Sequence, residues 1–209
     1  MHKGPTDRAA QAREKRRKEL LRAATSIFAK RGYRAASISD VIKAAGVARG
    51  TFYLYFRNKQ DILFAVIDDL REQQKLFIAR LSEQESCEAP KDLREFARQE
   101  FLAWLCFYDQ QRDALKILLR EANLIDAALE AKRAEVRRGV VEYLSKRIRR
   151  LQSEGVYQGN LSPEIVSHFL IGMVDEIALS YLQKKTKPNL EWLANQCVSF
   201  ELDGLLLRP

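Results

Sequence analysis

The sequence is poor in the residues that cross-link or interrupt a fold. It holds three cysteines, two histidines, five prolines and nine glycines among 209 residues. Cys87, Cys106 and Cys197 are odd in number and widely spaced, so neither a disulfide framework nor a zinc site is indicated. We also find no nucleophile–base pair, metal-ligand spacing or glycine-rich phosphate loop. An enzyme is therefore disfavoured, and no metal or other cofactor is expected.

Long apolar runs are absent as well. No apolar stretch reaches the roughly 18 residues that a membrane span requires, and the polar, basic start lacks the apolar segment of a secretory signal. We therefore expect a cytoplasmic protein. Glycine and proline fall at the edges of helical patterns, and no run of alternating β-branched residues occurs. These features predict an all-α fold.

Apolar residues spaced three and four apart, together with capping residues, predict about nine helices. Their expected ranges are 11–31, 38–45, 49–55, 59–81, 90–108, 111–122, 126–153, 163–184 and 189–207. Ser37, Ser162 and Asn189 are the predicted N-caps, and Pro90 is predicted in a first turn. We divide the chain into a flexible basic arm (1–10), a helix-turn-helix DNA-binding domain (11–57) and a ligand-binding and dimerisation domain (58–209).

Positive charge is concentrated at the N-terminal end. Residues 1–60 hold 15 Lys and Arg against 4 Asp and Glu, a formal charge of +11, whereas the remaining 149 residues hold 21 against 24, or −3. A basic, soluble tail is the simple explanation, but the positive charge continues through a segment that is predicted to fold. This distribution indicates a polyanionic partner for the N-terminal third.

The stretch from Ile38 to Phe56 has the pattern of a helix-turn-helix. Gly46 supplies the left-handed turn between two short helices, and the small Ala45 lets the helices cross closely. The second helix is too short to be stable alone, so Phe52 and Phe56 are predicted to anchor it inward. Its outer face then suits the DNA major groove. The residues expected to contact DNA are Ser37, Arg49, Gly50, Thr51, Tyr53, Tyr55 and Lys59.

The competing interpretation is a helical hairpin that only packs, with its tyrosines in a core. Four aromatic side chains cannot all face inward on a helix of seven residues, so some aromatic surface must be exposed. Exposed aromatic side chains beside a positive field favour a binding surface.

The same residues resemble a known family. The matching segments are Gly32-Tyr33, Ser37 to Ile42, Ala45-Gly46-Val47, Gly50 to Tyr53, Tyr55-Phe56, Asn58-Lys59 and Leu63. In this order and spacing they are similar to the DNA-binding domain of the TetR (tetracycline repressor-like) family of transcriptional regulators. The resemblance implies a three-helix DNA-binding domain, a larger helical ligand domain, and a dimer built from the last two long helices. It also implies a drug, lipid-like or acyl ligand.

The helix expected over 163–184 is apolar nearly all round, so it must be covered on every side. One side can meet its own domain, and the other most simply meets a second copy of the chain. A large monomeric core is the alternative. The residues predicted at the dimer interface are Phe169, Gly172, Met173, Asp175, Glu176, Tyr181, Trp192 and Phe200. Asp175 and Glu176 are expected to pair with Arg or Lys across the dimer; binding of a cationic ligand is the other interpretation.

The helix expected over 90–108 has more aromatic surface than a simple core stripe needs. Small-molecule sites favour such lining, although an aromatic stripe is more often plain core. The residues predicted to line a ligand pocket are Phe101, Trp104, Tyr108, Tyr143, Phe169 and Met173. By contrast, the basic run of the helix expected over 126–153 is predicted to be mostly a solvated face.

These patterns predict a dimeric transcriptional regulator. In the leading hypothesis it is a repressor that binds a palindromic double-stranded DNA operator and is released when a small molecule enters the C-terminal domain. The alternative is a constitutive DNA-binding protein without an inducer. The two hypotheses share every N-terminal feature and differ in whether the C-terminal core is filled.

Overall fold

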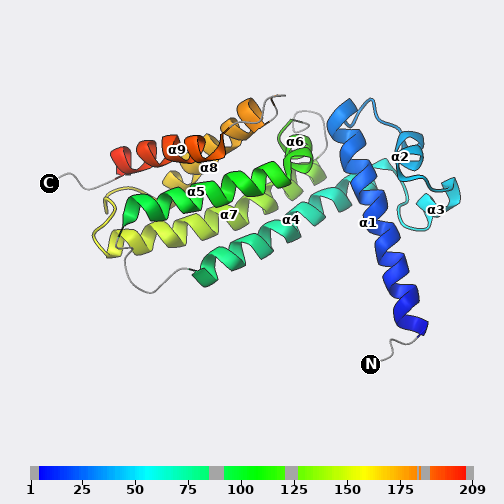
Figure 1. The fold of residues 1–209 in the computed structure, drawn as a ribbon, viewed down its shortest axis with the longest axis horizontal. Coiled ribbons are helices and arrows are strands. Elements are labelled where there is room, and N and C mark those ends of the chain that lie inside the picture. Colours follow the sequence, from blue (N-terminus) through cyan, green and yellow to red (C-terminus); the bar gives the residue numbers. More distant parts are fainter. Residues whose placement is uncertain (1–4, 85–91, 121–126, 183, 185–188, 206–209) are drawn as a thin grey trace. The chain divides into compact units, whose positions relative to one another are not determined.

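Nine α-helices make up most of the part of the chain that the computed structural model describes, which is residues 5–84, 92–120, 127–182, 184 and 189–205 (Figure 1). The predicted all-α fold is confirmed. The helices are α1 (Pro5–Arg31), α2 (Ile38–Ala45), α3 (Arg49–Tyr53), α4 (Lys59–Gln84), α5 (Leu93–Gln110), α6 (Arg112–Arg120), α7 (Ala127–Ser153), α8 (Pro163–Ile177) and α9 (Leu190–Leu205). No described helix is long and apolar enough to cross a membrane.

Helix α1 begins earlier than the sequence pattern predicted. It starts at Pro5, so residues 5–10 are helical and do not form a flexible arm. Proline suits the first helical turn, and the alanines that follow it favour the helix. Residues 1–4 of the predicted arm lie outside the described residues.

Three other helix boundaries differ from expectation. Helix α3 ends at Tyr53, two residues early. Helix α5 begins at Leu93, where the Asp92 carboxylate accepts a hydrogen bond from the Glu95 amide at 3.0 Å; Pro90 lies outside the described residues. Helix α8 ends at Ile177 and continues as a π-helical turn, η2 (Ala178–Leu182). The predicted caps at Ser162 and Asn189 are both confirmed.

The chain divides into two compact units, each described here by itself. Unit 1 comprises Met1–Leu70 and Asp113–Lys132, and unit 2 comprises Arg71–Arg112 and Arg133–Pro209. Helices α4 and α7 therefore contribute residues to both units.

Unit 1 is built around α1, α2 and α3. Leu20, Ala24 and Phe28 give α1 a fully buried stripe, and they recur at the spacing of one helix face. The first part of α4 adds Ile62 and Leu63 to the same core. The three predicted N-terminal helices thus share one apolar core.

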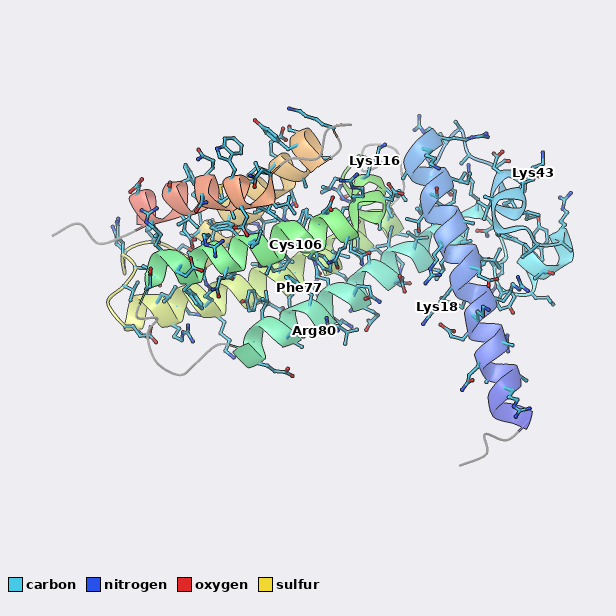
Figure 2. All side chains as sticks on the ribbon, viewed as in Figure 1. Lys18, Lys43, Phe77, Arg80, Cys106 and Lys116 are labelled. Carbon is cyan, nitrogen blue, oxygen red and sulfur yellow. The ribbon has the colours of Figure 1, made fainter. Side chains whose placement is uncertain are left out.

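In unit 2, α5 packs along α9 and is joined to the other helices by aromatic and polar contacts. Phe77 of α4 stacks on Phe107 with ring centroids 4.8 Å apart and meets Trp104 edge-on (Figure 2). Helices α7 and α8 meet where the hydroxyls of Ser145 and Ser167 lie 3.0 Å apart.

The start of α2 is fixed by a capping box. The Ser37 hydroxyl accepts the Asp40 amide at 3.2 Å, and the Asp40 carboxylate accepts the Ser37 amide at 2.9 Å, as the sequence predicted. Arg31 of α1 adds an ion pair to Asp40 at 2.7 Å. The hydrogen bonds from Ser37, together with Arg31, lower the pKa of Asp40 below 3.8.

Asp40→Asn tests this capping box. Because the pKa of Asp40 is lowered in the folded state, its carboxylate stabilises the fold above pH 3.8, and this contribution is lost as the pH falls through the lowered pKa. We therefore expect the variant to be less stable than the wild type at neutral pH, with the difference shrinking on acidification. Urea unfolding at a series of pH values measures it.

Asp69→Asn is the matched control, because Asp69 is an exposed carboxylate on α4. Its stability should follow that of the wild type at every pH. An identical pH dependence for both variants would show that the capping box does not carry the effect.

Candidate DNA-binding surface and ligand cavity

The turn between α2 and α3 has the geometry of a helix-turn-helix. Gly46 adopts φ 63° and ψ 34°, the left-handed region that glycine enters without a steric penalty. The amide of Val47 then donates to the Ile42 carbonyl at 3.3 Å. The chain is thereby turned into α3, as the sequence predicted.

Helix α3 is held by two phenylalanines. Phe52 is fully buried and Phe56 is nearly so, and their rings lie 5.9 Å apart, so the predicted inward anchors are confirmed. The opposite side of α3 faces solvent. Tyr53 is 46% exposed, and Arg49 lies with its guanidinium carbon 6.0 Å from the Tyr53 ring centroid.

The other residues predicted to contact DNA differ in their exposure. Gly50 is exposed, whereas Thr51 and Tyr55 are half-buried; Tyr55 follows the end of α3. Ser37 is exposed at the start of α2, but its hydroxyl donates to Asp40 at 2.8 Å.

Lys59 occupies a different environment from the one expected. Its ammonium donates to the carbonyl oxygens of Tyr33 at 2.9 Å, Arg34 at 3.3 Å and Ala36 at 2.9 Å. An ammonium has three N–H donors, so all of them are used within the protein. Lys59 therefore joins the start of α4 to the segment between α1 and α2, and this arrangement leaves no donor for the predicted phosphate contact.

Leu54 is a surface residue that the sequence analysis passed over. It follows α3 directly and is 73% exposed, more than any other large apolar side chain of the described residues. Its place after three residues of aromatic and polar character was the available signal, because a leucine without a core position must face outward. Leu54 extends the exposed surface of Arg49 and Tyr53.

Basic residues flank this surface within unit 1. Along α1, Arg13, Arg16 and Lys18 are exposed, and Lys43 is exposed on α2 (Figure 2). The guanidinium of Arg17 lies 5.8 Å from the Phe56 ring centroid. The predicted positive field therefore has an exposed basic counterpart in the structure.

A cavity of about 30 Å³ lies between α5, α7, α8 and α9. That volume holds one or two water molecules. Its walls include the predicted residues Phe101, Trp104 and Tyr108 from α5, together with apolar residues of α7 and α8. Tyr143 is not part of the wall; its ring centroid lies 6.4 Å from that of Trp104.

Two residues assigned to the ligand pocket lie elsewhere. Phe169 is 67% exposed, and Met173 is half-buried outside the cavity wall. The wall is formed instead by Leu170, Ile171 and Val174. Since one turn of helix takes 3.6 residues, these three share one face of α8 and Phe169 points away from it. The assignment of Phe169 and Met173 to the pocket is therefore wrong.

The cavity ends in a buried ionic cluster that the sequence analysis missed. The Nε of Arg147 lies 2.6 Å from Oε2 of Glu100, and its Nη1 donates to Oε1 of Glu201 at 3.3 Å. The hydroxyl of Tyr157 also donates to Oε1 of Glu201, at 2.5 Å. Arg147 is 3% exposed, so the expectation that the basic run of α7 is solvated fails at this residue.

The electrostatics of the cluster follow from its burial. Burial opposes the charged form of Arg147, but the carboxylates of Glu100 and Glu201 raise the pKa of its guanidinium above the ordinary value. Burial, together with the Glu201 carboxylate, raises the pKa of Tyr157. Arg147 therefore stays charged and Tyr157 stays a hydrogen-bond donor across the neutral range.

Asp175 is engaged within its own chain. It accepts a hydrogen bond from the Tyr108 hydroxyl at 2.6 Å and lies 4.0 Å from the Arg137 guanidinium. Burial raises the pKa of Asp175, against the lowering effects of Tyr108 and Arg137. The predicted pairing across a dimer thus has an alternative partner in α5. Glu176 is exposed and accepts from Ser180 at 2.7 Å.

The remaining residues predicted for the dimer lie on exposed faces of unit 2. On α8, Phe169 and Gly172 are exposed, and Tyr181 of η2 is partly so. On α9, Trp192 is 51% and Phe200 65% exposed. Large aromatic side chains in these positions form an unusually apolar surface for a helical protein in water.

The fold and the exposed α3 define a helix-turn-helix DNA-binding protein. Residues 20–66 match the family model described as bacterial regulatory proteins, tetR family. Over 193 residues the chain is 28% identical to the fatty acid metabolism regulator protein of Bacillus subtilis, covering 90% of this chain and 94% of that one. It is 26% identical over 195 residues to the transcriptional repressor KstR2 of Rhodococcus jostii, covering 91% of each.

Two solved structures have a similar fold over nearly the whole chain. The fatty acid degradation regulator FadR from Bacillus halodurans superposes with a TM-score of 0.77 at 25% identity, covering 100% of both chains. FadR from Bacillus subtilis, solved with stearoyl-CoA, gives a TM-score of 0.73 at 25% identity, covering 89% of this chain and 97% of that one. The chain belongs to the TetR family of transcriptional regulators. It is a DNA-binding regulator and not an enzyme.

Lys59→Ala tests the structural assignment of this lysine. Removing the ammonium leaves the carbonyls of Tyr33 and Ala36 without their donor, so we expect the free energy of unfolding to fall by roughly 1–3 kcal/mol. The salt dependence of operator binding should stay that of the wild type, measured as the slope of log affinity against log salt.

Lys43→Ala, which removes an exposed lysine of α2, is the control for stability and should unfold like the wild type. A phosphate contact by Lys59 would instead reduce the salt slope by about 0.9. That reduction, with unchanged stability, would contradict the assignment.

Proposed function

We propose that this protein is a dimeric, cytoplasmic repressor that binds a palindromic operator and leaves it when a small molecule enters unit 2. The observation that carries the DNA-binding part is the exposed side of α3, held out by buried Phe52 and Phe56 within a strongly basic segment. We retain the functional division into a DNA-binding region up to residue 57 and a ligand-binding and dimerisation region beyond it.

The exposed side of α3 suits the major groove. Arg49 can donate two hydrogen bonds to a guanine edge, and Tyr53 can pack against a thymine or a sugar. Leu54 adds an apolar contact for a thymine methyl group. Ser37, Thr51 and Tyr55 supply further hydroxyl groups for phosphate or base contacts.

Gly50 supports a close approach between α3 and DNA. A Cβ atom at this position would meet nothing of the protein within 4 Å, so packing inside the chain does not require glycine there. A DNA backbone lying against the exposed start of α3 would require it.

The dimer is supported by the exposed aromatic side chains of α8 and α9. Phe169, Trp192 and Phe200 are each more than half exposed in a single chain. A two-fold contact would cover the same apolar patch on both copies and match the symmetry of a palindromic operator.

Ligand release is supported by α4 and by the cavity wall. Phe77 of α4 packs against Trp104, and Trp104 lines the cavity. Since α4 continues from unit 2 into unit 1, a ligand that displaces Trp104 would also displace α4. The two recognition helices of the dimer would then leave the spacing of about 34 Å that successive major grooves demand.

A second candidate is a constitutive DNA-binding regulator without an inducer. The observation in its favour is the volume of about 30 Å³, which is too small for any inducer of drug or lipid size. In this candidate the C-terminal core is simply well packed.

Arg49→Ala and Tyr53→Ala test DNA recognition. Each should weaken binding to the selected operator by about tenfold to a hundredfold, because a specific base contact contributes about 1–3 kcal/mol. Both variants should stay dimeric and keep the wild-type melting temperature, since the two side chains face solvent. The operator is selected from a random DNA pool, and affinity is measured by fluorescence anisotropy.

Phe169→Glu is the contrasting variant. It should yield monomers in analytical ultracentrifugation and lose operator binding with α3 intact. Full operator affinity in Arg49→Ala and Tyr53→Ala would remove the recognition assignment, and a dimeric Phe169→Glu protein would remove the dimer interface.

Stearoyl-CoA separates the inducible candidate from the constitutive one, because it is the molecule bound to a regulator of similar fold. If unit 2 takes an acyl ligand, stearoyl-CoA raises the melting temperature and releases the labelled operator. Free coenzyme A serves as the control for the acyl chain. A melting temperature and operator affinity that no acyl-CoA changes would favour the constitutive regulator.

A further inference from the structure

The polar end of the cavity has more negative than positive groups. Two carboxylates, Glu100 and Glu201, face the single guanidinium of Arg147, and all three residues line the cavity. Glu201 is 1% exposed, so solvent screens its charge poorly. The cluster therefore carries a formal charge of −1 in a low-dielectric setting, where a compensating positive charge is worth most.

Two atoms at this end also lack a hydrogen-bond partner within the described part of the chain. They are Oε2 of Glu201, an acceptor, and Nε1 of Trp104, a donor. Both residues are more than nine-tenths buried and both line the cavity. Buried polar groups are almost always hydrogen-bonded in folded proteins, so this pair calls for a partner from outside the chain.

The protein directs its own donors to the other oxygen of the same carboxylate. Arg147 and Tyr157 both donate to Oε1 of Glu201. The distribution leaves Oε2 as an acceptor position toward the cavity. A carboxylate accepts several hydrogen bonds, and its second oxygen is an acceptor of full strength.

We infer that this end of the cavity binds the donor group of an apolar amphiphile, an amine or a hydroxyl, and rejects a carboxylate. An ammonium donates to Glu201 and neutralises the excess charge. A hydroxyl donates to Glu201 and can accept from Trp104. A carboxylate ligand has no donor for Oε2 and brings a third negative charge. This inference rests on the proposed ligand cavity and names the chemical class of its ligand.

The apolar part of such a ligand has a defined place. Leu144, Leu170 and Val174 form the wall beyond the ionic cluster. Because the cavity is only about 30 Å³, these side chains must move apart to admit an alkyl chain. The selection for a donor group does not depend on that movement, since it is set by the charges of the cluster.

Three molecules with the same dodecyl chain test the inference: dodecylamine, dodecanol and dodecanoate, each below its micellar concentration. Binding to the full-length protein is measured by calorimetry and thermal shift at neutral pH. We expect dodecylamine and dodecanol to bind at least tenfold more tightly than dodecanoate. The overall charge of the protein is +8, so non-specific attraction would favour the opposite order.

Glu201→Gln isolates the residue responsible. The amide keeps an oxygen for Tyr157 and Arg147 but removes the charge, so dodecylamine should lose at least tenfold in affinity while dodecanol changes less than about threefold. Dodecanoate should gain affinity. Glu191→Gln is the matched control, because Glu191 is an exposed glutamate of the same helix, and it should leave all three affinities unchanged.

Each outcome bears on one claim. Equal or tighter binding of dodecanoate to the wild type, absence of amine binding, or an unchanged ranking in Glu201→Gln overturns the inference. The wild-type ranking stands without any variant, so it decides even if Glu201→Gln fails to fold. Tight amine binding that never releases the operator supports the inference and instead contradicts the proposed ligand-released repressor.

Discussion

The burial of Phe52 and Phe56 is the constraint on which the DNA-binding surface depends. Helix α3 has five residues, far too few to be helical in isolation, so its shape comes from the two side chains beneath it. Gly46 brings the chain to this position. Because the buried side is occupied by phenylalanine, Arg49 and Tyr53 are left to face outward. A change that loosens this packing would remove the binding surface without touching any residue that it presents.

Unit 2 combines the same kind of apolar packing with a buried ionic cluster. A buried guanidinium is costly unless carboxylates and hydrogen bonds surround it, and Arg147 meets this condition by joining α7 to Glu100 of α5 and Glu201 of α9. The cluster therefore fixes the register of three helices at one end of the cavity. The Tyr108–Asp175 hydrogen bond joins α5 to α8 in the same unit. Polar contacts thus set the positions of helices whose apolar faces would tolerate several registers.

Helical periodicity explains both the successes and the errors of sequence reasoning in this unit. Phe101, Trp104 and Tyr108 recur at spacings of three and four, and all three line the cavity. Phe169 was assigned to both the pocket and the dimer, but one side chain faces one direction, and it faces out. Arg147 lies on the same helical face as the buried Leu144 and Leu151. Its position in that stripe was visible, but its charge led to the solvated interpretation.

The amino-acid sequence by itself determined the all-α class, the capping box at Ser37, the turn at Gly46 and the inward pair Phe52 and Phe56. These features are local, since they depend on residues a few positions apart. Tertiary structure alone decided the role of Lys59, whose three acceptors lie 23–26 residues earlier, and the cluster of Glu100, Arg147 and Glu201. Contacts between distant segments depend on how helices pack, and periodicity within one helix carries no information about its neighbour.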